Sequence, residues 1–180
     1  MDLFTVGHSS HGVDAFAALL RGAGVQQVAD VRRWPRSRRH PHFDDDALAV
    51  ELASHGIAYA HVAELGGRRE RVPGSPNDGW EVEAFNGYAD HLASAEFARG
   101  LSRLMALAAA RPTAVMCAEG DWRRCHRQLI ADVLALRGAA DVRHVALDGT
   151  IERHAVTELA VYAADAGLPR YPAPQLGLGF

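Results

Sequence analysis

Two cysteines, a carboxylate and a histidine lie close together in one stretch of the sequence. Cys117 ends an apolar run, Glu119 follows it, and Cys125 and His126 come directly before Arg127. A thiolate is stabilised by nearby arginines or a helix N-terminus and is then a nucleophile. The segment that begins at Cys125 also offers free backbone N–H groups and the Arg127 guanidinium, which can bind a phosphate or a carboxylate. These residue types therefore allow nucleophilic catalysis or anion binding.

Spacing alone does not decide what Cys117 does. Cys117 and Arg123 match a Cys-x5-Arg spacing, but Glu119 and Asp121 lie between them, where a phosphate-binding loop needs bare N–H groups. A small buried residue that happens to be cysteine is the competing interpretation. Cysteine-dependent phosphatase or sulfurtransferase-like chemistry through Cys117 therefore remains an alternative function.

Three carboxylates, Asp30, Glu64 and Glu119, fall within two residues of the ends of predicted strands and near arginines. Each could act in catalysis, or could pair with an arginine and hold a loop in place, since buried charges are usually paired. A metal site built from them is opposed by the positive charge of the same loops. The cysteines and the adjacent histidine also lack the Cys-x2-Cys spacing of common zinc sites. We expect no metal and no cofactor.

The positive charge is clustered although the net charge is only -3. All 19 basic residues are arginine, and 11 of them fall in the segments 32–39, 68–71 and 123–127. Such clusters suit an anionic ligand, whereas the net charge argues against a general nucleic-acid coat. Aromatic residues that could stack on a base lie in or beside the same segments: Trp34, Phe43, Trp80, Phe85, Tyr88 and Trp122. For Phe85 and Tyr88, core packing is an equal alternative.

Alternation of apolar runs with helical periodicity predicts the elements that carry these residues. Strands are expected at 3–7, 25–31, 57–62, 113–117 and 142–147. Helices are expected at 13–20, from the acidic residues 44–46 through Leu52, and at 82–92, 95–109, 125–137 and 152–166. This order predicts an α/β three-layer sandwich, Rossmann-like, with a mostly parallel five-stranded sheet. We expect one domain over 1–180, with its core at about 3–167 and a C-terminal surface tail at 168–180.

The bulk composition sets further limits. Hydrophobic residues make up 48% and charged residues 23% of the chain, as in ordinary globular proteins. No apolar run reaches the roughly 18 residues of a membrane helix, and the N-terminus does not resemble a signal peptide. The two cysteines suit reduced thiols better than a disulfide framework. We therefore expect a cytoplasmic protein without a membrane partner, whose oligomeric state the sequence leaves open.

Several short motifs, in order over roughly residues 3–147, resemble the bacterial domain of unknown function 488 (DUF488) family. They are Thr5-Val6-Gly7-His8-Ser9, Asp30-Val31-Arg32 with Pro35 and Ser37, Phe43, Leu65-Gly66-Gly67, Phe85 with Tyr88, Cys117-Ala118-Glu119 and Cys125-His126-Arg127. The resemblance implies an α/β fold and supports these site residues, but implies no established reaction. The chain departs from the pattern at Gly120-Asp121-Trp122, where a proline is expected.

In an open parallel sheet, ligands bind beyond the carboxyl ends of the strands, so the unusual loops should converge on one pocket. There we expect His8, Asp30, Cys117 and Glu119 as catalytic residues. We expect the substrate to be bound by Ser9, Arg32, Ser37, Arg38, Phe43, Gly66, Gly67, Arg68, Tyr88, Cys125, His126 and Arg127. For His8 and Ser9, capping of the next helix is the alternative.

The preferred hypothesis is an enzyme that acts on nucleic acid or a nucleotide. Most concretely, it is a hydrolase of the DNA-repair type, a metal-independent, base-excising DNA N-glycosidase. In it, arginines hold phosphates, an aromatic side chain stacks on the extruded base, and Asp30 or Glu119 orients water. A non-catalytic module that binds nucleotide or nucleic acid through the same arginines is a further alternative.

Overall fold

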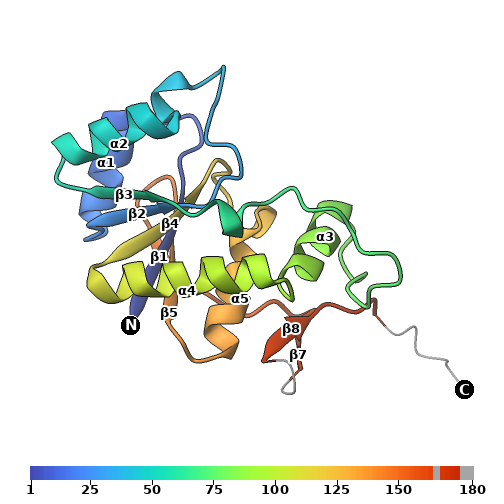
Figure 1. Cartoon of the computed structure of the whole chain (residues 1–180). Coiled ribbons are helices and arrows are strands. Elements are labelled where there is room, and N and C mark those ends of the chain that lie inside the picture. The colour runs from blue at the N-terminus through green and yellow to red at the C-terminus, as the bar shows by residue number, and fades with distance from the viewer. Residues whose placement is uncertain (164–166, 175–180) are drawn as a thin grey trace, which may run out of the picture.

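The computed structural model describes residues 1–163 and 167–174, and in it a mixed sheet lies between two layers of helices (Figure 1). The described strands of this sheet run in the order β3-β2-β4-β1-β5-β6. Their bounds are β1 Asp2–Gly7, β2 Gln27–Asp30, β3 Ala58–His61, β4 Thr113–Cys117, β5 Asp141–Val145 and β6 Ile151–Arg153. Neighbours pair in parallel from β3 to β5, and β6 is antiparallel to β5. This is the α/β sandwich that the sequence predicts, with one more strand at its edge.

One face of the sheet is covered by α1, Val13–Gly22, and α2, Asp45–Ser54 (Figure 1). Alternate residues of a strand point to opposite faces. Phe4 and Met116 therefore join Phe16 and Leu48 of these helices in one buried cluster. Because both faces of each central strand are buried, its sequence is continuously apolar rather than alternating.

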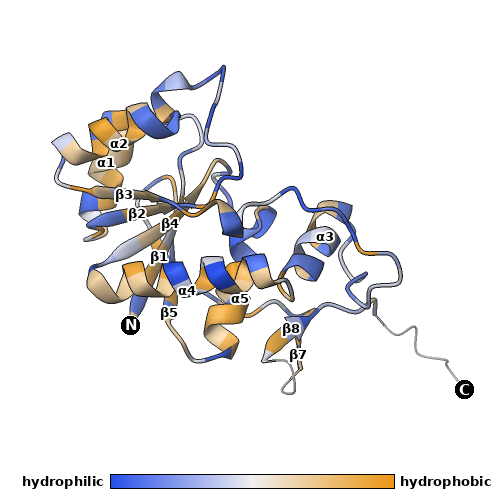
Figure 2. Cartoon of the chain, viewed as in Figure 1, coloured by the Kyte–Doolittle hydropathy of each residue, from blue (hydrophilic) through white to orange (hydrophobic). Residues whose placement is uncertain are grey.

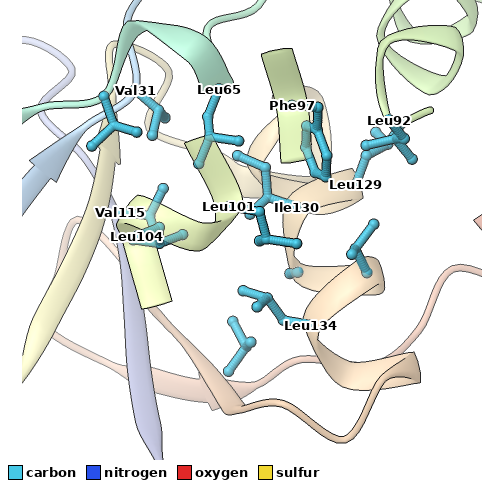
Figure 3. Packing of buried hydrophobic residues seen from close by; sticks show 14 of the residues in the cluster. Val31, Leu65, Leu92, Phe97, Leu101, Leu104, Val115, Leu129, Ile130 and Leu134 are labelled. Carbon is cyan, nitrogen blue, oxygen red and sulfur yellow. The ribbon is translucent and has the colours of Figure 1, made fainter. Parts of the chain in front are cut away.

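The other face is covered by α4, Ala95–Ala110, and α5, Arg127–Leu136, while α3, Glu83–His91, lies beyond the end of the sheet (Figure 1). Figure 3 shows Leu101 and Leu104 of α4 between Val115 of β4 and Ile130 of α5. Figure 2 shows hydrophobic residues along these helices and hydrophilic residues along much of the loop 32–40. Packing of the apolar faces holds the helices on the sheet, and the polar loops lie at one end of the sheet.

The predicted closing helix over 152–166 is wrong for its described part, and its last three positions lie outside the described residues. In its place are β6 and, after a loop, β7, Val161–Ala163. The physical reason is the buried carboxylate of Asp132, which accepts hydrogen bonds from His154 Nε2 and from the Thr157 backbone N–H, both at 2.9 Å. The Asp132 carboxylate thus accepts hydrogen bonds from this segment in a non-helical conformation. In a helix, the backbone N–H groups would have bonded to the carbonyls of the helix itself.

The predicted surface tail over 168–180 begins with a strand and a buried tyrosine. Residues Leu168–Arg170 form β8, which pairs antiparallel with β7. Tyr171 is fully buried, and its hydroxyl donates to Asp132 Oδ2 at 2.9 Å. Its backbone N–H donates to Asn77 Oδ1 at 3.0 Å, so this segment also holds the long loop that precedes α3. The rest of the predicted tail, 175–180, lies outside the described residues.

In the part of the chain that the structure describes, no helix is both long enough and apolar enough to cross a bilayer.

Candidate active-site pocket

A pocket of about 790 Å³ lies at the carboxyl ends of β1, β2 and β4. This volume is in the range of small-molecule sites. The loops after all three strands contribute to its wall, together with the loop after β3 and the start of α3. The residues in its lining that the sequence predicted for the site are His8, Ser9, Arg32, Ser37, Gly67, Arg68, Tyr88, Cys117, Glu119, Cys125 and His126.

The loops after β1 and β4 are bound tightly to each other. The backbone N–H groups of His8 and Ser9 donate to the carbonyls of Cys117 and Ala118, each at 3.0 Å. This close approach requires Gly7, because a Cβ at that position would lie 1.8 Å from the carbonyl oxygen of Glu119. The two loops therefore form one rigid wall of the pocket.

Two residues of the pocket lining have a backbone conformation that side chains rarely adopt. Ser9 has φ 48° and Arg68 has φ 57°, and they are the non-glycine residues with positive φ in the described chain. Such strain persists only where surrounding contacts fix the backbone, and it is frequent at functional sites. Next to Arg68, a Cβ on Gly67 would lie 2.9 Å from His126 Nδ1, so the glycine lets this loop close over the other wall.

Asp30, at the end of β2, lies beneath the pocket and does not line it. It is 0% exposed, and its carboxylate accepts hydrogen bonds from Arg32 Nη2 at 2.6 Å, Arg32 Nε at 2.9 Å and the Tyr59 hydroxyl at 2.7 Å. Arg32 Nη2 also donates to the Phe43 carbonyl at 2.7 Å. With its oxygens occupied in this way, Asp30 acts on Arg32, which does line the pocket.

His8 is held as a neutral base in the wall. Its ring stacks on Phe43, with centroids 4.1 Å apart. Burial, reinforced by the charge of Arg32, lowers the pKa of His8 to about 4. Its Nδ1 lies 3.0 Å from the Ser9 carbonyl oxygen, which can only accept, so Nδ1 carries the proton. The buried Nε2 has no hydrogen-bond partner within the described protein and is left with a free lone pair.

The two cysteines meet in the pocket lining, with their sulfur atoms 2.8 Å apart. Burial raises the pKa of Cys117 well above its usual value, and the adjacent Cys125 sulfur adds to this. Burial alone would also raise the pKa of Cys125. The hydrogen bond from Cys117 and the positive charges of His126 and Arg127 outweigh it and lower that pKa. Cys125 is therefore the more acidic of the two thiols, whereas the sequence singled out Cys117.

Glu119 is exposed and is the carboxylate of the pocket lining in the described chain. Its Oε2 lies 3.4 Å from Cys125 Sγ, and its backbone carbonyl accepts a hydrogen bond from Arg127 Nη2 at 2.6 Å. The arginines of the lining are Arg32, Arg33, Arg36, Arg39, Arg68 and Arg124. One acidic group thus faces a strongly cationic wall.

A chain of buried hydrogen bonds supports Arg127 from behind the pocket. Because the Asp132 carboxylate accepts from His154 Nε2 at 2.9 Å, His154 Nδ1 accepts from His144 Nε2 at 3.0 Å. His144 Nδ1 then accepts from the Thr5 hydroxyl at 2.6 Å, and Thr5 Oγ1 accepts from Arg127 Nη1 at 3.4 Å. Burial, reinforced by the charge of Arg127, lowers the pKa of His144 to about 3, as a neutral ring in this chain requires.

Cys117, Glu119 and Cys125 are also compact enough to be considered as metal ligands. Their ligand atoms all lie within 4.8 Å of one another. Two thiolates on one tetrahedral zinc, with Zn–S bonds of about 2.3 Å, lie roughly 3.8 Å apart. The 2.8 Å separation of these sulfurs is shorter than this spacing.

The sequence profile described as "Domain of unknown function DUF488" matches residues 12–134. The chain belongs to this family. The matched range includes the pocket residues from Arg32 to His126, while His8 and Ser9 precede it. No curated protein and no solved structure matches the chain.

The DUF488 pocket differs in detail from the site that the sequence predicts. The predicted residues that do not line it are Asp30, Arg38, Phe43, Gly66 and Arg127. Four of these act from behind the wall: Asp30 and Phe43 contact Arg32 and His8, Arg127 holds the loop at Glu119, and the Gly66 carbonyl accepts from Arg69 Nε at 2.8 Å.

Sequence reasoning missed several residues of the lining: Arg33, Arg36, Arg39, His40, Val82, Ala84 and Arg124. Trp34 was recognised only as a possible stacking residue. It is 60% exposed in the pocket, with the Arg33 and Arg68 guanidinium carbons 4.9 and 5.9 Å from its ring centre. The clustering of arginines was the available signal. It marks the segment but does not tell which side chains of an irregular loop point inward.

Proposed function

We propose that this DUF488 protein is an enzyme that acts on nucleic acid or a nucleotide, most concretely a base-excising N-glycosidase. The observation that carries the proposal is an exposed carboxylate, Glu119, within a pocket whose lining includes six arginines and the aromatic rings of Trp34, Phe85 and Tyr88. A cationic wall suits phosphates, which Arg can bind through two parallel hydrogen bonds. The volume of about 790 Å³ is sufficient for one nucleotide.

In the proposed reaction, the bond between the sugar C1′ and the base nitrogen breaks and leaves positive charge on the sugar. The Glu119 carboxylate stabilises this charge and accepts the proton of the attacking water, whose oxygen bonds to C1′. Arginines hold the flanking phosphates and stabilise the negative charge on the departing base. Trp34, exposed between Arg33 and Arg68, supplies a plane on which an extruded base stacks.

The structure favours Glu119 over Asp30 for this role. Both carboxylates were candidates, but Asp30 is fully buried and bound by Arg32 and Tyr59. A carboxylate that activates water must reach the water and the substrate directly. Glu119 is exposed in the pocket lining and has room to do so.

The test is a panel of duplex and single-stranded oligonucleotides, each with one damaged or modified base, incubated with the purified protein. Release of a free base, detected by mass spectrometry, or an alkali-labile site in the strand supports the proposal. Glu119→Gln should abolish the release while the oligonucleotide still binds. Inertness of the wild-type protein across a broad panel would contradict the glycosidase reaction. Binding of the oligonucleotides without any turnover would instead support a non-catalytic binding module.

Thiol chemistry is the second candidate, and the contact between Cys125 and Cys117 specifically favours it. A thiolate among arginines can attack the phosphorus of a phosphate monoester or the outer sulfur of a thiosulfate. The contacts of Cys125 with His126 Nδ1 and Arg127 Nε support Cys125 for this role. A phosphatase or sulfurtransferase activity should therefore be lost in Cys125→Ser. An activity that survives this change would exclude catalysis by the Cys125 thiolate.

A further inference from the structure

The paired sulfurs of Cys117 and Cys125 are placed for a reaction that the proposed glycosidase does not use. They are 2.8 Å apart, and both belong to the pocket lining. A disulfide bond is about 2.05 Å long, so less than about 1 Å of movement separates the pair from a covalent bond. The chain contains 2 cysteines, so a disulfide within one chain can only be this one.

The backbone holds the two sulfurs in this position. Cys117 is the last residue of β4 and lies in register with Gly7 of β1. Cys125 lies two residues before Arg127, the first residue of α5, which fixes the intervening loop through the Glu119 carbonyl. Because both ends of the loop are anchored, the thiols meet without the ordering cost that a flexible loop would add.

The two sulfurs have different surroundings. Cys125 Sγ lies 3.5 Å from both His126 Nδ1 and Arg127 Nε and is 3.4 Å from Glu119 Oε2. Cys117 Sγ contacts the Glu119 carbonyl at 3.7 Å and the partner sulfur. The cationic neighbours favour a thiolate at Cys125, which is the reactive form of a cysteine. The pocket gives a small oxidant a route to it.

We propose that Cys117 and Cys125 are a redox modification site, at which a peroxide converts the thiol pair into a reversible disulfide. The Cys125 thiolate attacks one peroxide oxygen, the O–O bond breaks, and a sulfenic acid forms while the other oxygen leaves as water or an alcohol after taking a proton. The Cys117 sulfur then attacks the Cys125 sulfur, the S–O bond breaks, and water leaves with the Cys117 proton. The pair loses two electrons and the peroxide gains them. A dithiol reductant reduces the disulfide back to the two thiols and becomes a disulfide itself.

This inference does not depend on the glycosidase reaction. It does predict that oxidation changes the pocket, because the disulfide removes the negative charge that faces His126 and Arg127 and draws the two sulfurs together. The same atoms would carry the thiol chemistry of the second candidate function, so that activity would be lost on oxidation and restored on reduction.

The sequence provides a sharp assay for the bond. Trypsin cleaves after Arg123 and Arg124 and therefore separates Cys117 from Cys125. After treatment of the reduced protein with hydrogen peroxide, one disulfide-linked peptide pair should appear in a non-reducing digest. Free thiols measured in denaturant should fall to none, and dithiothreitol should restore both. Oxidation that yields only sulfinic acids, or disulfides only between chains, would overturn the proposal.

Single variants test the assigned order. In Cys117→Ser the Cys125 sulfenic acid has no resolving thiol and should be trapped by dimedone. In Cys125→Ser, Cys117 should react with hydrogen peroxide at least about tenfold more slowly. Equal rates in the two variants would overturn the assignment. Alanine replacements, with circular dichroism for each, separate a reactivity effect from misfolding. Stoichiometric zinc on the thiols of the purified protein, released only by a chelator, would also overturn the proposal.

Discussion

The guanidinium of Arg32 lies against both carboxylate oxygens of Asp30, with Nη2 at 2.6 Å from Oδ2 and Nε at 2.9 Å from Oδ1. The Arg32 backbone N–H also donates to Oδ1 at 3.0 Å. The pair is buried, with 8% and 0% of the two side chains exposed. This places an acid at the end of β2 in a supporting role and leaves the arginine to line the pocket.

The first prediction is that Asp30→Asn destabilises the fold. The change leaves the Arg32 charge buried without its partner, and breaking a buried pair costs about 3–5 kcal/mol. Urea unfolding should measure the loss. Asp46→Asn is the matched control, since Asp46 meets Arg36 at 3.4 Å on the surface with 71% of its side chain exposed, and it should change little. A stable Asp30→Asn protein without activity would instead indicate direct catalysis by Asp30.

The second prediction concerns Trp34, which is exposed and flanked by two arginines. Removal of a base-stacking ring costs about 1–3 kcal/mol of binding per base, so Trp34→Ala should weaken oligonucleotide binding about fivefold or more, measured by fluorescence anisotropy. The melting temperature should stay near the wild-type value. Trp80→Ala is the contrast, because Trp80 packs on Phe85 and Tyr171 with ring centres 5.0 and 5.5 Å apart. That variant should lose stability. Unchanged binding by Trp34→Ala would remove the stacking role.

The third prediction is a pH dependence that comes from His8. Its pKa is about 4 in the folded chain and 6.5 for a free histidine. Between these values the unfolded chain binds more protons, so the free energy of unfolding rises with pH. The His8 contribution is fully present above pH 6.5 and is lost as the pH falls toward about 4. The loss is roughly 3 kcal/mol.

Urea unfolding at several pH values measures this slope. His8→Gln, which does not titrate, should flatten it without removing it. His144 remains, and its pKa, lowered from 6.5 to about 3, adds a loss of the same sign between these two pH values. A slope that His8→Gln leaves unchanged would show that His8 is not held neutral.

Particular residues show how far the sequence could predict this molecule. Residues 113–117 were predicted as a strand and are β4, because a short apolar run bounded by a proline and a polar loop has few alternatives. Residues 152–166 have helical periodicity, but Asp132, some 20 residues earlier in the chain, determines their conformation through His154 and Thr157. A local sequence pattern carries no information about a partner at this distance in the chain.

The same limit applies to the pocket. The rule that strands of a parallel sheet present their carboxyl ends on one side brought His8, Arg32, Cys117 and Glu119 together correctly. It could not place Asp30 beneath the pocket, because position at a strand end does not tell which way a side chain points. It also could not select Arg39 over Arg38, because the loop between Pro35 and Pro41 has no period.

The last prediction tests the rigid wall through Gly7. A Cβ at this position would lie 1.8 Å from the Glu119 carbonyl oxygen and 2.6 Å from its carbonyl carbon, and both are backbone atoms that no side-chain rotation can move. Gly7→Ala should therefore push the loop 118–120 away from β1, break the hydrogen bonds of His8 and Ser9 to it, and destabilise the protein by about 3 kcal/mol. Gly12→Ala is the matched control, because nothing lies within 4 Å of a Cβ there. If Gly7→Ala folds as stably as Gly12→Ala, loss of the Cys117 to Cys125 disulfide after peroxide treatment would still report a displaced wall. A wild-type result in both measurements would show that the two loops are not held as one unit.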